Sequence, residues 1–580
     1  MFKSLYKETE GFRLVSILTP LCMIGEVVME MIIPKLMSSI IDDGVTAGNL
    51  SHIYRIGGWM IVAAAFGLLF GVLGGVFGAR ASTGYARNLR RSMYRNIQTF
   101  SFANIDKYST AGLVTRMTTD VTNIQNAYQM ILRMAIRAPS SMVIAMIMAF
   151  TINAKLASIY LVAVIILGGC LVLIMSRASN YFSAAFKKYD DLNESVQENV
   201  SAIRVVKAYV REDYESEKFK KASGNVQNLL LRAEKVLSFN SPLMMATVYT
   251  CILLISWLGA RMIVLSGATS FTTGELMSML TYCTNILTSL MMLSMVFAML
   301  TISLSSARRI AEVIEEKTDI QNPEHPVMAV RDGAIDFDHV SFVYASKADK
   351  KVLDDIDLHI RSGETIGVIG GTGASKSSLV QLIPRLYDVT AGKLTLGGVD
   401  VRDYDLETLR NAVAMVLQKN ELFSGTIKEN LRWGNENATD EELRHACVLA
   451  CADEFISAMP DGYDTYIEQG GTNVSGGQKQ RLCIARALLK KPKVLILDDS
   501  TSAVDTRTDA QIQQALSAYI PETTKIIIAQ RISSVQNADR IVVLDDGHIA
   551  DVGSHEELLH TSEIYREVYE SQQKGGEDDA

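Results

Sequence analysis

The sequence lacks three features that would assign the protein to other classes. Its seven cysteines show no paired spacing and lie within apolar or helical patterns, so thiols in a reducing compartment explain them better than disulfides or a metal site. The formal net charge is −8, which argues against nucleic acid as the main partner. The N-terminal apolar run contains Glu26 and Glu30 and has no small-residue cleavage pattern, so a cleaved signal peptide is not predicted.

Long apolar runs, by contrast, fill the first half of the chain. Hydrophobic residues make up 48% of the 580 positions, and a chain of this length needs more than one domain. A membrane-spanning helix needs roughly 20 mainly apolar residues. Six segments approach this length: Leu14–Ile41, Gly57–Ala79, Met134–Thr151, Leu156–Ser176, Leu243–Leu265 and Leu276–Leu300. The sequence therefore predicts an all-α, six-helix transmembrane domain.

The connections between these segments predict their orientation. Arg80–Arg133 and Arg177–Pro242 are long and rich in Lys and Arg, whereas the other connections are short and carry few cations. An excess of Lys and Arg marks the cytoplasmic side, which would also hold the N-terminus and everything after Leu300. Both long connections have helical spacing, so we expect the helices to continue into the cytoplasm. Turns near Thr110–Gly112 and Tyr209–Asp213 could then hold a cytoplasmic domain.

Two features of the predicted spans leave alternatives open. Glu26 and Glu30 lie one helical turn apart and should face the bundle or water, because a carboxylate in hydrocarbon is costly. They could form a patch for a cationic substrate, a hydrogen-bond network between helices, or a site near the outer water. The last span is rich in methionine, which suits either an adaptable apolar surface or ordinary packing.

The second half has the composition of a soluble α/β domain and contains a phosphate-binding loop. A strand at Ile366 leads into Gly370–Ser377, which fits the glycine-rich motif except that Ser375 replaces the glycine before the lysine. Backbone N–H groups cradle the phosphates in such a loop, so a serine can still serve. Lys376 would reach the β and γ phosphates, and Ser377 would ligate Mg²⁺.

Two further motifs support a nucleotide site. The apolar strand Val494–Leu497 ends at Asp498, which is placed to hold Mg²⁺. Ser475, Gly476 and Gly477 precede a long helix, and a helix N-terminus is itself an anion site. The chain thus has two phosphate-binding helix starts. If one nucleotide needs both, a second domain could supply one of them in a head-to-tail pair.

Together these motifs resemble one half of an ATP-binding cassette (ABC) exporter, over nearly the whole chain. The resemblance implies a six-helix domain of the type IV exporter kind, followed by an α/β P-loop nucleotide-binding domain. It implies that Tyr344 stacks on adenine and that Gln418 links the Mg²⁺ site to the membrane helices. It identifies Val474–Gln478 as the signature sequence and Ser502–Asp505 as a loop that communicates across a dimer. The segments around Gly112 and Val210 would be coupling helices.

The expected site residues follow from these motifs. Those expected at ATP are Tyr344, Gly370, Gly371, Thr372, Gly373, Ala374, Ser375, Lys376, Ser377, Ser378, Gln418, Ser475, Gly476, Gly477 and Gln478. Those expected at Mg²⁺ are Ser377, Gln418 and Asp498, and those expected in catalysis are Asp499 and Gln530.

Asp499 and Gln530 depart from the family pattern. The family has a glutamate where Asp499 stands, to polarise the attacking water, and a histidine where Gln530 stands. Aspartate is shorter by about 1.5 Å, and glutamine cannot become cationic as histidine can. Asp499 could still act as a weak base through an extra water, but the paired change favours impaired hydrolysis. The chain thus resembles the degenerate-site subunit of bacterial heterodimeric multidrug exporters, with most hydrolysis expected at the partner's site.

We therefore expect a subunit of an ATP-driven efflux pump in a bacterial plasma membrane, acting on hydrophobic or cationic small molecules with a different half-transporter as partner. The alternatives are a lipid or peptide exporter subunit and a nucleotide-gated channel or regulatory subunit. The expected parts are a transmembrane domain with cytoplasmic extensions (1–318), a linker (319–333), a nucleotide-binding domain (334–568) and a disordered acidic tail (569–580).

Overall fold

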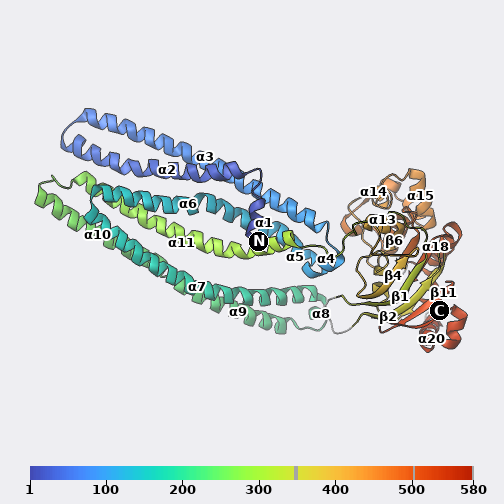
Figure 1. Ribbon diagram of the computed structural model, residues 1–580. Helices are drawn as coiled ribbons and strands as arrows, with labels where there is room; N and C mark the ends of the chain where they lie inside the picture. Colours follow the sequence, from blue (N-terminus) through green and yellow to red (C-terminus); the bar gives the residue numbers. More distant parts are fainter. Residues whose placement is uncertain (345–350, 372, 501–502, 578–580) are drawn as a thin grey trace. The chain divides into compact units, whose positions relative to one another are not determined.

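The computed structural model describes residues 1–344, 351–371, 373–500 and 503–577. The chain forms two compact units (Figure 1). Unit 1 comprises residues 1–99 and 109–316, and unit 2 comprises residues 100–108 and the chain from 317 onward. A short segment from the first half of the chain therefore belongs to the second unit.

Unit 1 is entirely helical in the residues that the structure describes. Its helices are α1 (Phe2–Lys7), α2 (Arg13–Ser39), α3 (Leu50–Ile97), α5 (Thr110–Thr115), α6 (Val121–Ile152), α7 (Ala154–Ser201), α8 (Ile203–Ala208), α9 (Glu212–Leu237), α10 (Asn240–Ser266) and α11 (Thr273–Glu315). Short π-helical stretches, Ile40–Thr46 and Arg116–Asp120, extend α2 and join α5 to α6. Within the described residues, six helical stretches of 34 to 55 residues are long and apolar enough to cross a membrane. The predicted six-helix membrane domain is confirmed.

Local capping explains where two of the long helices begin. The Asn153 side chain accepts hydrogen bonds from the N–H groups of Lys155 and Leu156, so a single residue separates α6 from α7. Thr272 and Glu275 form a reciprocal capping box at the start of α11. Side-chain oxygens thus satisfy backbone donors at these helix ends.

The two glutamates of the first span form an interhelical ion pair network. Arg137 of α6 donates from Nη1 to Glu26 Oε1 at 2.5 Å and from Nη2 to Glu30 Oε2 at 2.8 Å, so both carboxylates of α2 share one guanidinium. Of the three alternatives left open by the sequence, the structure shows a network between helices. Pairing with one arginine offsets part of the cost of placing these two carboxylates in the membrane.

Unit 2 is built on two main sheets. The antiparallel sheet has the order β2 (Leu353–Ile360), β1 (Ile335–Phe342), β4 (Ala391–Leu396) and β5 (Val399–Asp400). The larger sheet has the order β12 (His548–Gly553), β11 (Arg540–Asp545), β3 (Thr365–Gly370), β10 (Thr524–Ile528), β9 (Val494–Asp498) and β6 (Val413–Val416). Within it only β12 pairs antiparallel. A small hairpin pairs β7 (Gly425–Thr426) with β8 (Tyr466–Ile467).

The helices of unit 2 complete an α/β domain, as predicted. They are α4 (Phe102–Tyr108), α12 (Lys376–Gln381), α13 (Leu406–Ala412), α14 (Ile427–Arg432), α15 (Asp440–Leu449), α16 (Asp453–Ser457), α17 (Gly476–Leu488), α18 (Thr506–Tyr519), α19 (His555–Thr561) and α20 (Glu563–Glu577). All residues of β9 and β10 are buried, as expected for parallel strands covered on both faces.

The carboxyl edge of the parallel sheet gathers the predicted site residues. Strands β3, β9, β10 and β6 run in the same direction and end at Gly370, Asp498, Ile528 and Val416. The loops that follow them carry the glycine-rich sequence, Asp499, Gln530 and Gln418. Ligands of parallel α/β sheets bind at this edge.

Candidate functional site: a phosphate-binding loop at the sheet edge

The lysine of the glycine-rich motif folds back and binds the carbonyl oxygens of the loop. Lys376 Nζ donates to the carbonyl oxygens of Gly370 at 2.8 Å and Gly371 at 2.9 Å. Burial lowers the pKa of Lys376, and the negative charges of Asp499 and Asp498 oppose that shift. The ammonium group therefore lies between the loop and the two carboxylates, where a phosphate could replace the carbonyl contacts.

The loop has room for a ligand on one side only. A Cβ built on Gly370 would lie 2.3 Å from Leu544 O, so this glycine allows close packing against β11. A Cβ built on Gly371 or Gly373 would meet nothing within 4 Å. Thr372 lies outside the described residues. The open side of the loop and the adjacent ammonium group fit a polyphosphate chain.

Ser375, the departure from the motif, adopts the backbone conformation that usually calls for glycine. Its φ is +68° where it begins α12. A left-handed conformation costs a non-glycine residue about 1–2 kcal/mol. The serine hydroxyl gives little in return, since its contact to Gly373 O, at 3.5 Å, is a weak one. The loop therefore keeps its shape at an energetic cost.

Two of the three residues expected at Mg²⁺, Ser377 and Asp498, contact each other. Ser377 Oγ donates to Asp498 Oδ1 at 3.0 Å. Burial raises the pKa of Asp498, as does the charge of Asp499, while the bond from Ser377 and the charge of Lys376 lower it. Among the described residues, no group of three His, Cys, Asp or Glu side chains could hold a metal alone. One hydroxyl and one carboxylate suit Mg²⁺, whose other ligands are commonly water and phosphate oxygens.

Asp499 and Gln530, the two departures, contact each other directly. Gln530 Nε2 donates to Asp499 Oδ2 at 2.9 Å, and Gln418 Nε2 makes a longer contact of 3.5 Å to the same oxygen. The φ of Asp499 is +48°, a conformation that aspartate tolerates better than most residues. The sheet thus brings the three side chains together, with the carboxylate held by amide groups.

The signature residues begin helix α17. Ser475 Oγ accepts from Gln478 N at 3.3 Å, and Gln478 Oε1 accepts from Ser475 N at 2.9 Å, which forms a capping box. A Cβ built on Gly477 would lie 2.8 Å from Ala503 O, whereas one built on Gly476 would meet only the Ala503 side chain, at 3.4 Å. Gly477 is thus needed for packing within its own chain.

The sequence did not reveal a hydrogen bond between α17, which begins at the signature, and the loop that follows β9. Gln480 is buried, and its Oε1 accepts from Ala503 N at 3.0 Å. Ser502 of that loop lies outside the described residues, while Asp505 caps α18 through Thr508 N. A polar residue on the buried face of a predicted helix would have been the signal, since buried amides need partners.

Tyr344 lies at the other end of the site. Its ring is 44% exposed, and its hydroxyl lies 2.8 Å from Ser378 Oγ at the start of α12. The exposed ring, hydrogen-bonded to the helix that follows the phosphate-binding loop, is available for stacking on a base.

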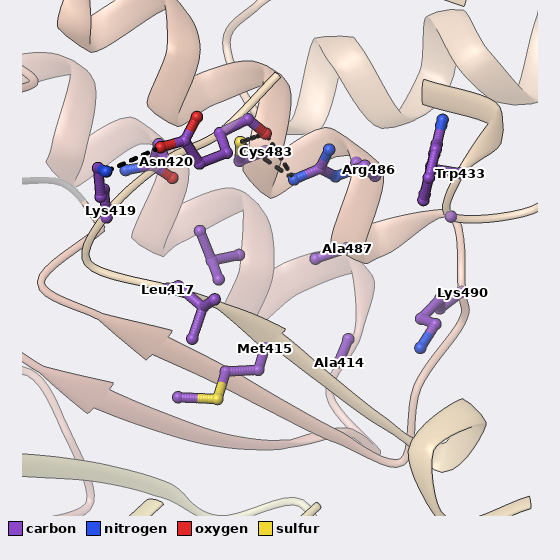
Figure 2. Close-up of a pocket in the computed structure, with 13 residues that line it drawn as sticks. Ala414, Met415, Leu417, Lys419, Asn420, Trp433, Cys483, Arg486, Ala487 and Lys490 are labelled. Atoms are coloured by element: carbon purple, nitrogen blue, oxygen red, sulfur yellow. Dashed lines mark hydrogen bonds and ion pairs between the residues drawn. The ribbon is translucent and has the colours of Figure 1, made fainter. Parts of the chain in front are cut away.

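Gln418 lies between the site and a surface pocket. A pocket of about 270 Å³ is lined by its neighbours Leu417 and Lys419 and by residues of β6 and α17 (Figure 2). Trp433 lines the pocket and stacks on Phe423, with ring centroids 4.1 Å apart. One backbone segment therefore carries Gln418, which contacts Asp499, and the two neighbours that line the pocket.

The segment that unit 2 takes from the first half of the chain differs from the expected one. The resemblance placed a contact segment around Gly112, but helix α4, at Phe102–Tyr108, is the part that belongs to unit 2. Gly112 belongs to unit 1, just inside α5. The break between helices lies at Ser109, because α4 ends at Tyr108 and α5 begins at Thr110. The turn therefore comes slightly earlier in the chain than the sequence spacing indicated.

Comparison with known families decides the identity. Residues 16–291 match the ABC transporter transmembrane region, and residues 353–502 match the ABC transporter nucleotide domain. A relative described as an uncharacterized ABC transporter ATP-binding protein, YfiB of Bacillus subtilis, is 37% identical over 95% of both chains. The chain belongs to the ABC transporter family. It is a multi-pass, ATP-hydrolysing ABC transporter with an exporter fold.

Two other relatives of this ABC transporter carry functional names. The probable multidrug resistance transporter YheI of Bacillus subtilis is 32% identical and covers 94% of this chain and 93% of its own. The ATP-dependent lipid A-core flippase of Desulfotalea psychrophila is 33% identical over 85% of each. A solved structure of a bacterial Atm1-family ABC exporter with ATP bound matches with a TM-score of 0.81 at 24% identity, over 97% of this chain and 99% of its own, which supports the fold.

The conformation of Ser375 predicts that Ser375→Gly stabilises unit 2. Glycine adopts a φ near +68° without strain, which stabilises the folded state. Glycine also raises the conformational entropy of the unfolded chain, so the net rise in the free energy of unfolding should be about 0.5–1 kcal/mol. Differential scanning calorimetry of the full-length transporter without nucleotide measures this change. Ser375→Ala is the matched control, because alanine keeps the strain and should leave the transition within about 0.5 kcal/mol. Equal transitions for the glycine and alanine variants would contradict the prediction.

Proposed function

We propose that this ABC transporter is one subunit of a heterodimeric efflux pump of the bacterial plasma membrane, with its nucleotide domain in the cytoplasm. Its own site binds ATP with Mg²⁺ but hydrolyses it slowly. The observation that supports this most is the direct contact between Asp499 and Gln530, 2.9 Å from amide nitrogen to carboxylate oxygen. The two groups that depart from the family pattern therefore contact each other.

Retained residues account for nucleotide binding. The N–H groups of the loop and Lys376 would bind the phosphates, and Tyr344 would stack on the base. Ser377 and Asp498, 3.0 Å apart, would hold Mg²⁺, which when bound neutralises phosphate charge. None of these roles requires the groups that changed.

Slow hydrolysis follows from the length and partners of Asp499. An aspartate carboxylate falls about 1.5 Å short of a glutamate carboxylate, and a misplacement near 1 Å can cost about 100-fold in rate, or roughly 2.7 kcal/mol of barrier. Gln530 donates one N–H of its amide to Asp499, and the amide carries no ionisable charge near neutral pH. A weakly placed base beside a neutral amide should polarise water poorly.

The intact signature supports a different subunit as partner. Ser475 and Gln478 preorganise the start of α17, and the resemblance assigns this helix start to the ATP held by the other subunit. In a homodimer both sites would carry Asp499 and Gln530. A partner with a glutamate and a histidine would have a competent site that this chain completes.

The substrate class rests on the relatives and on unit 1. A pocket of about 600 Å³ between α7 and α11 has mainly apolar walls, including Leu171, Leu290 and Phe297, and carries Ser179 and Asn180 toward one end. This lining suits hydrophobic compounds, and one relative is named a probable multidrug resistance transporter. A lipid exporter is the second candidate, favoured by the lipid A-core flippase among the relatives and by the same amphipathic lining.

The first prediction from this proposal concerns assembly. Reconstituted alone in lipid nanodiscs, the chain should hydrolyse ATP about 100-fold more slowly than when co-purified with its partner half-transporter, because both sites of a homodimer would carry the weak groups. Steady-state ATPase assays at equal protein concentration measure this difference. Vigorous, drug-stimulated turnover by the purified homodimer would overturn the heterodimer.

The second prediction compares two substitutions within the complex. Asp499→Asn should reduce ATPase activity by no more than about threefold, since that carboxylate is already poorly placed. Gly476→Asp puts a carboxylate at a helix start that should meet the partner's ATP, and repulsion should abolish nearly all turnover. Gly476 is preferred to Gly477 because a side chain there does not collide with the chain's own backbone.

Melting temperature and ATP binding at the chain's own site serve as folding controls for both variants. ATPase and drug efflux are measured in membranes that contain equal amounts of each complex. A larger loss from Asp499→Asn than from Gly476→Asp would mean that this chain's own site does most of the hydrolysis.

A further inference from the structure

Tyr387 joins two features of unit 2 that lie far apart in the sequence. Its side chain is 9% exposed. Its hydroxyl donates to Asp106 Oδ2 of α4 at 2.7 Å. Its ring meets Phe102 of α4 edge-on at 5.9 Å and Tyr344 edge-on at 5.1 Å, both with planes 89° apart. One buried ring therefore contacts both α4 and the aromatic side chain proposed to stack on the base.

Short connections join helix α4 to helices of unit 1 at both of its ends. It follows α3, which ends at Ile97, and precedes α5, which begins at Thr110. Phe102 also packs against the hydrophobic core of unit 2. Helix α4 therefore belongs to unit 2 but lies between two of the candidate membrane spans in the chain.

The turn that carries Tyr387 contains a buried arginine that contacts a second connecting segment. Arg385 is 5% exposed and makes a two-pronged ion pair with Asp388, at 2.7 and 3.1 Å. Its Nη1 also donates to the carbonyl of Gln321, in the segment that follows α11, at 3.2 Å. Asn104 of α4 donates to the carbonyl of Lys317 in the same segment at 3.3 Å. Two segments that lead from membrane helices thus meet at one turn.

The hydroxyl of Tyr387 is suited to a permanent donor role. Burial raises the pKa of Tyr387, and its bond to Asp106 adds to that shift, so the phenol stays protonated at physiological pH. A buried tyrosine with its hydroxyl satisfied by a carboxylate makes a strong, directional contact. The ring and the hydroxyl can then act on different partners at once.

We propose that Tyr387 is a positioning residue that transmits occupation of the base site at Tyr344 to helix α4. The phosphates alone do not engage this route, because it starts at the aromatic ring. The inference rests on the proposed ATP site and adds a part to it: the base, rather than the phosphate chain, reports binding to the α3–α5 connection. Stacking of a base on Tyr344 restricts that ring, and the edge contact passes the restriction to Tyr387 and α4.

Hydrogen–deuterium exchange of the full-length chain in lipid nanodiscs tests the proposal. With Mg²⁺ present, ATP should slow amide exchange across residues 100–109 several-fold. Inorganic tripolyphosphate, which has the phosphates without the base, should leave it nearly unchanged. In Tyr387→Phe, which lacks the bond to Asp106, most of the ATP-dependent slowing should be lost, while ATP affinity changes by less than about threefold.

Matched variants separate this role from a general loss of stability. Tyr463→Phe removes another tyrosine–aspartate bond of 2.7 Å, to Asp453, and should keep the ATP-dependent slowing. Asp106→Asn retains a carbonyl acceptor for the phenol and should largely keep it, whereas Asp106→Ala should behave like Tyr387→Phe.

The outcomes separate the inference from the function on which it rests. Wild-type slowing by tripolyphosphate equal to that by ATP, or undiminished slowing in Tyr387→Phe, would overturn the role of Tyr387 while leaving the ATP site intact. Absence of ATP binding by the wild-type chain would instead overturn the nucleotide site itself.

Discussion

The parallel pairing of β3, β10 and β9 is the constraint on which the rest of the site depends. It aligns Gly370, Asp498 and Ile528 at one edge, so the loops that follow them must share a small volume. Lys376 and the two aspartates then lie close enough for the charge of Asp499 to act on the pKa values of Lys376 and Asp498. Asp499 leaves the edge at a positive φ, which directs its side chain toward Gln530. The sheet therefore sets the local geometry of the candidate site.

In unit 1, ion pairs between helices, rather than strand pairing, hold distant chain segments together. Buried charged side chains need partners within the bundle, both in the candidate membrane spans and in the extensions of these helices. Glu26 and Glu30 share Arg137, and Asp120, which is 1% exposed, accepts from both Arg309 and Ser306 of α11. These contacts join α2 to α6 and the start of α6 to the end of α11. Such pairs resist separation of the helices they join, because breaking them leaves a charge unpaired.

Much of this architecture could be predicted from the sequence, where the signal is periodic or local. Run length predicts the membrane helices, and motif spacing predicts the phosphate-binding loop and the strand that ends at Asp498. Contacts between distant segments could not be predicted, because spacing carries no information about them. That Arg137 would pair with Glu26 is one case, and that α4 would pack on Tyr387 is another. Ser375 and Gln530 are visible in the sequence as departures from the motifs. The strained φ of Ser375 and the hydrogen bond of Gln530 to Asp499 are visible only in the folded structure.

Restoring the two family groups is the most direct test of the account. In the double variant Asp499→Glu and Gln530→His, a carboxylate about 1.5 Å longer and an ionisable ring return to an otherwise complete site. The chain alone, reconstituted in nanodiscs, should then hydrolyse bound ATP at least about tenfold faster than the wild-type chain in a single-turnover assay, with ATP affinity little changed. If the double variant binds ATP but hydrolyses it no faster than the wild-type chain, Asp499 and Gln530 are not what limits this site and the central claim is wrong.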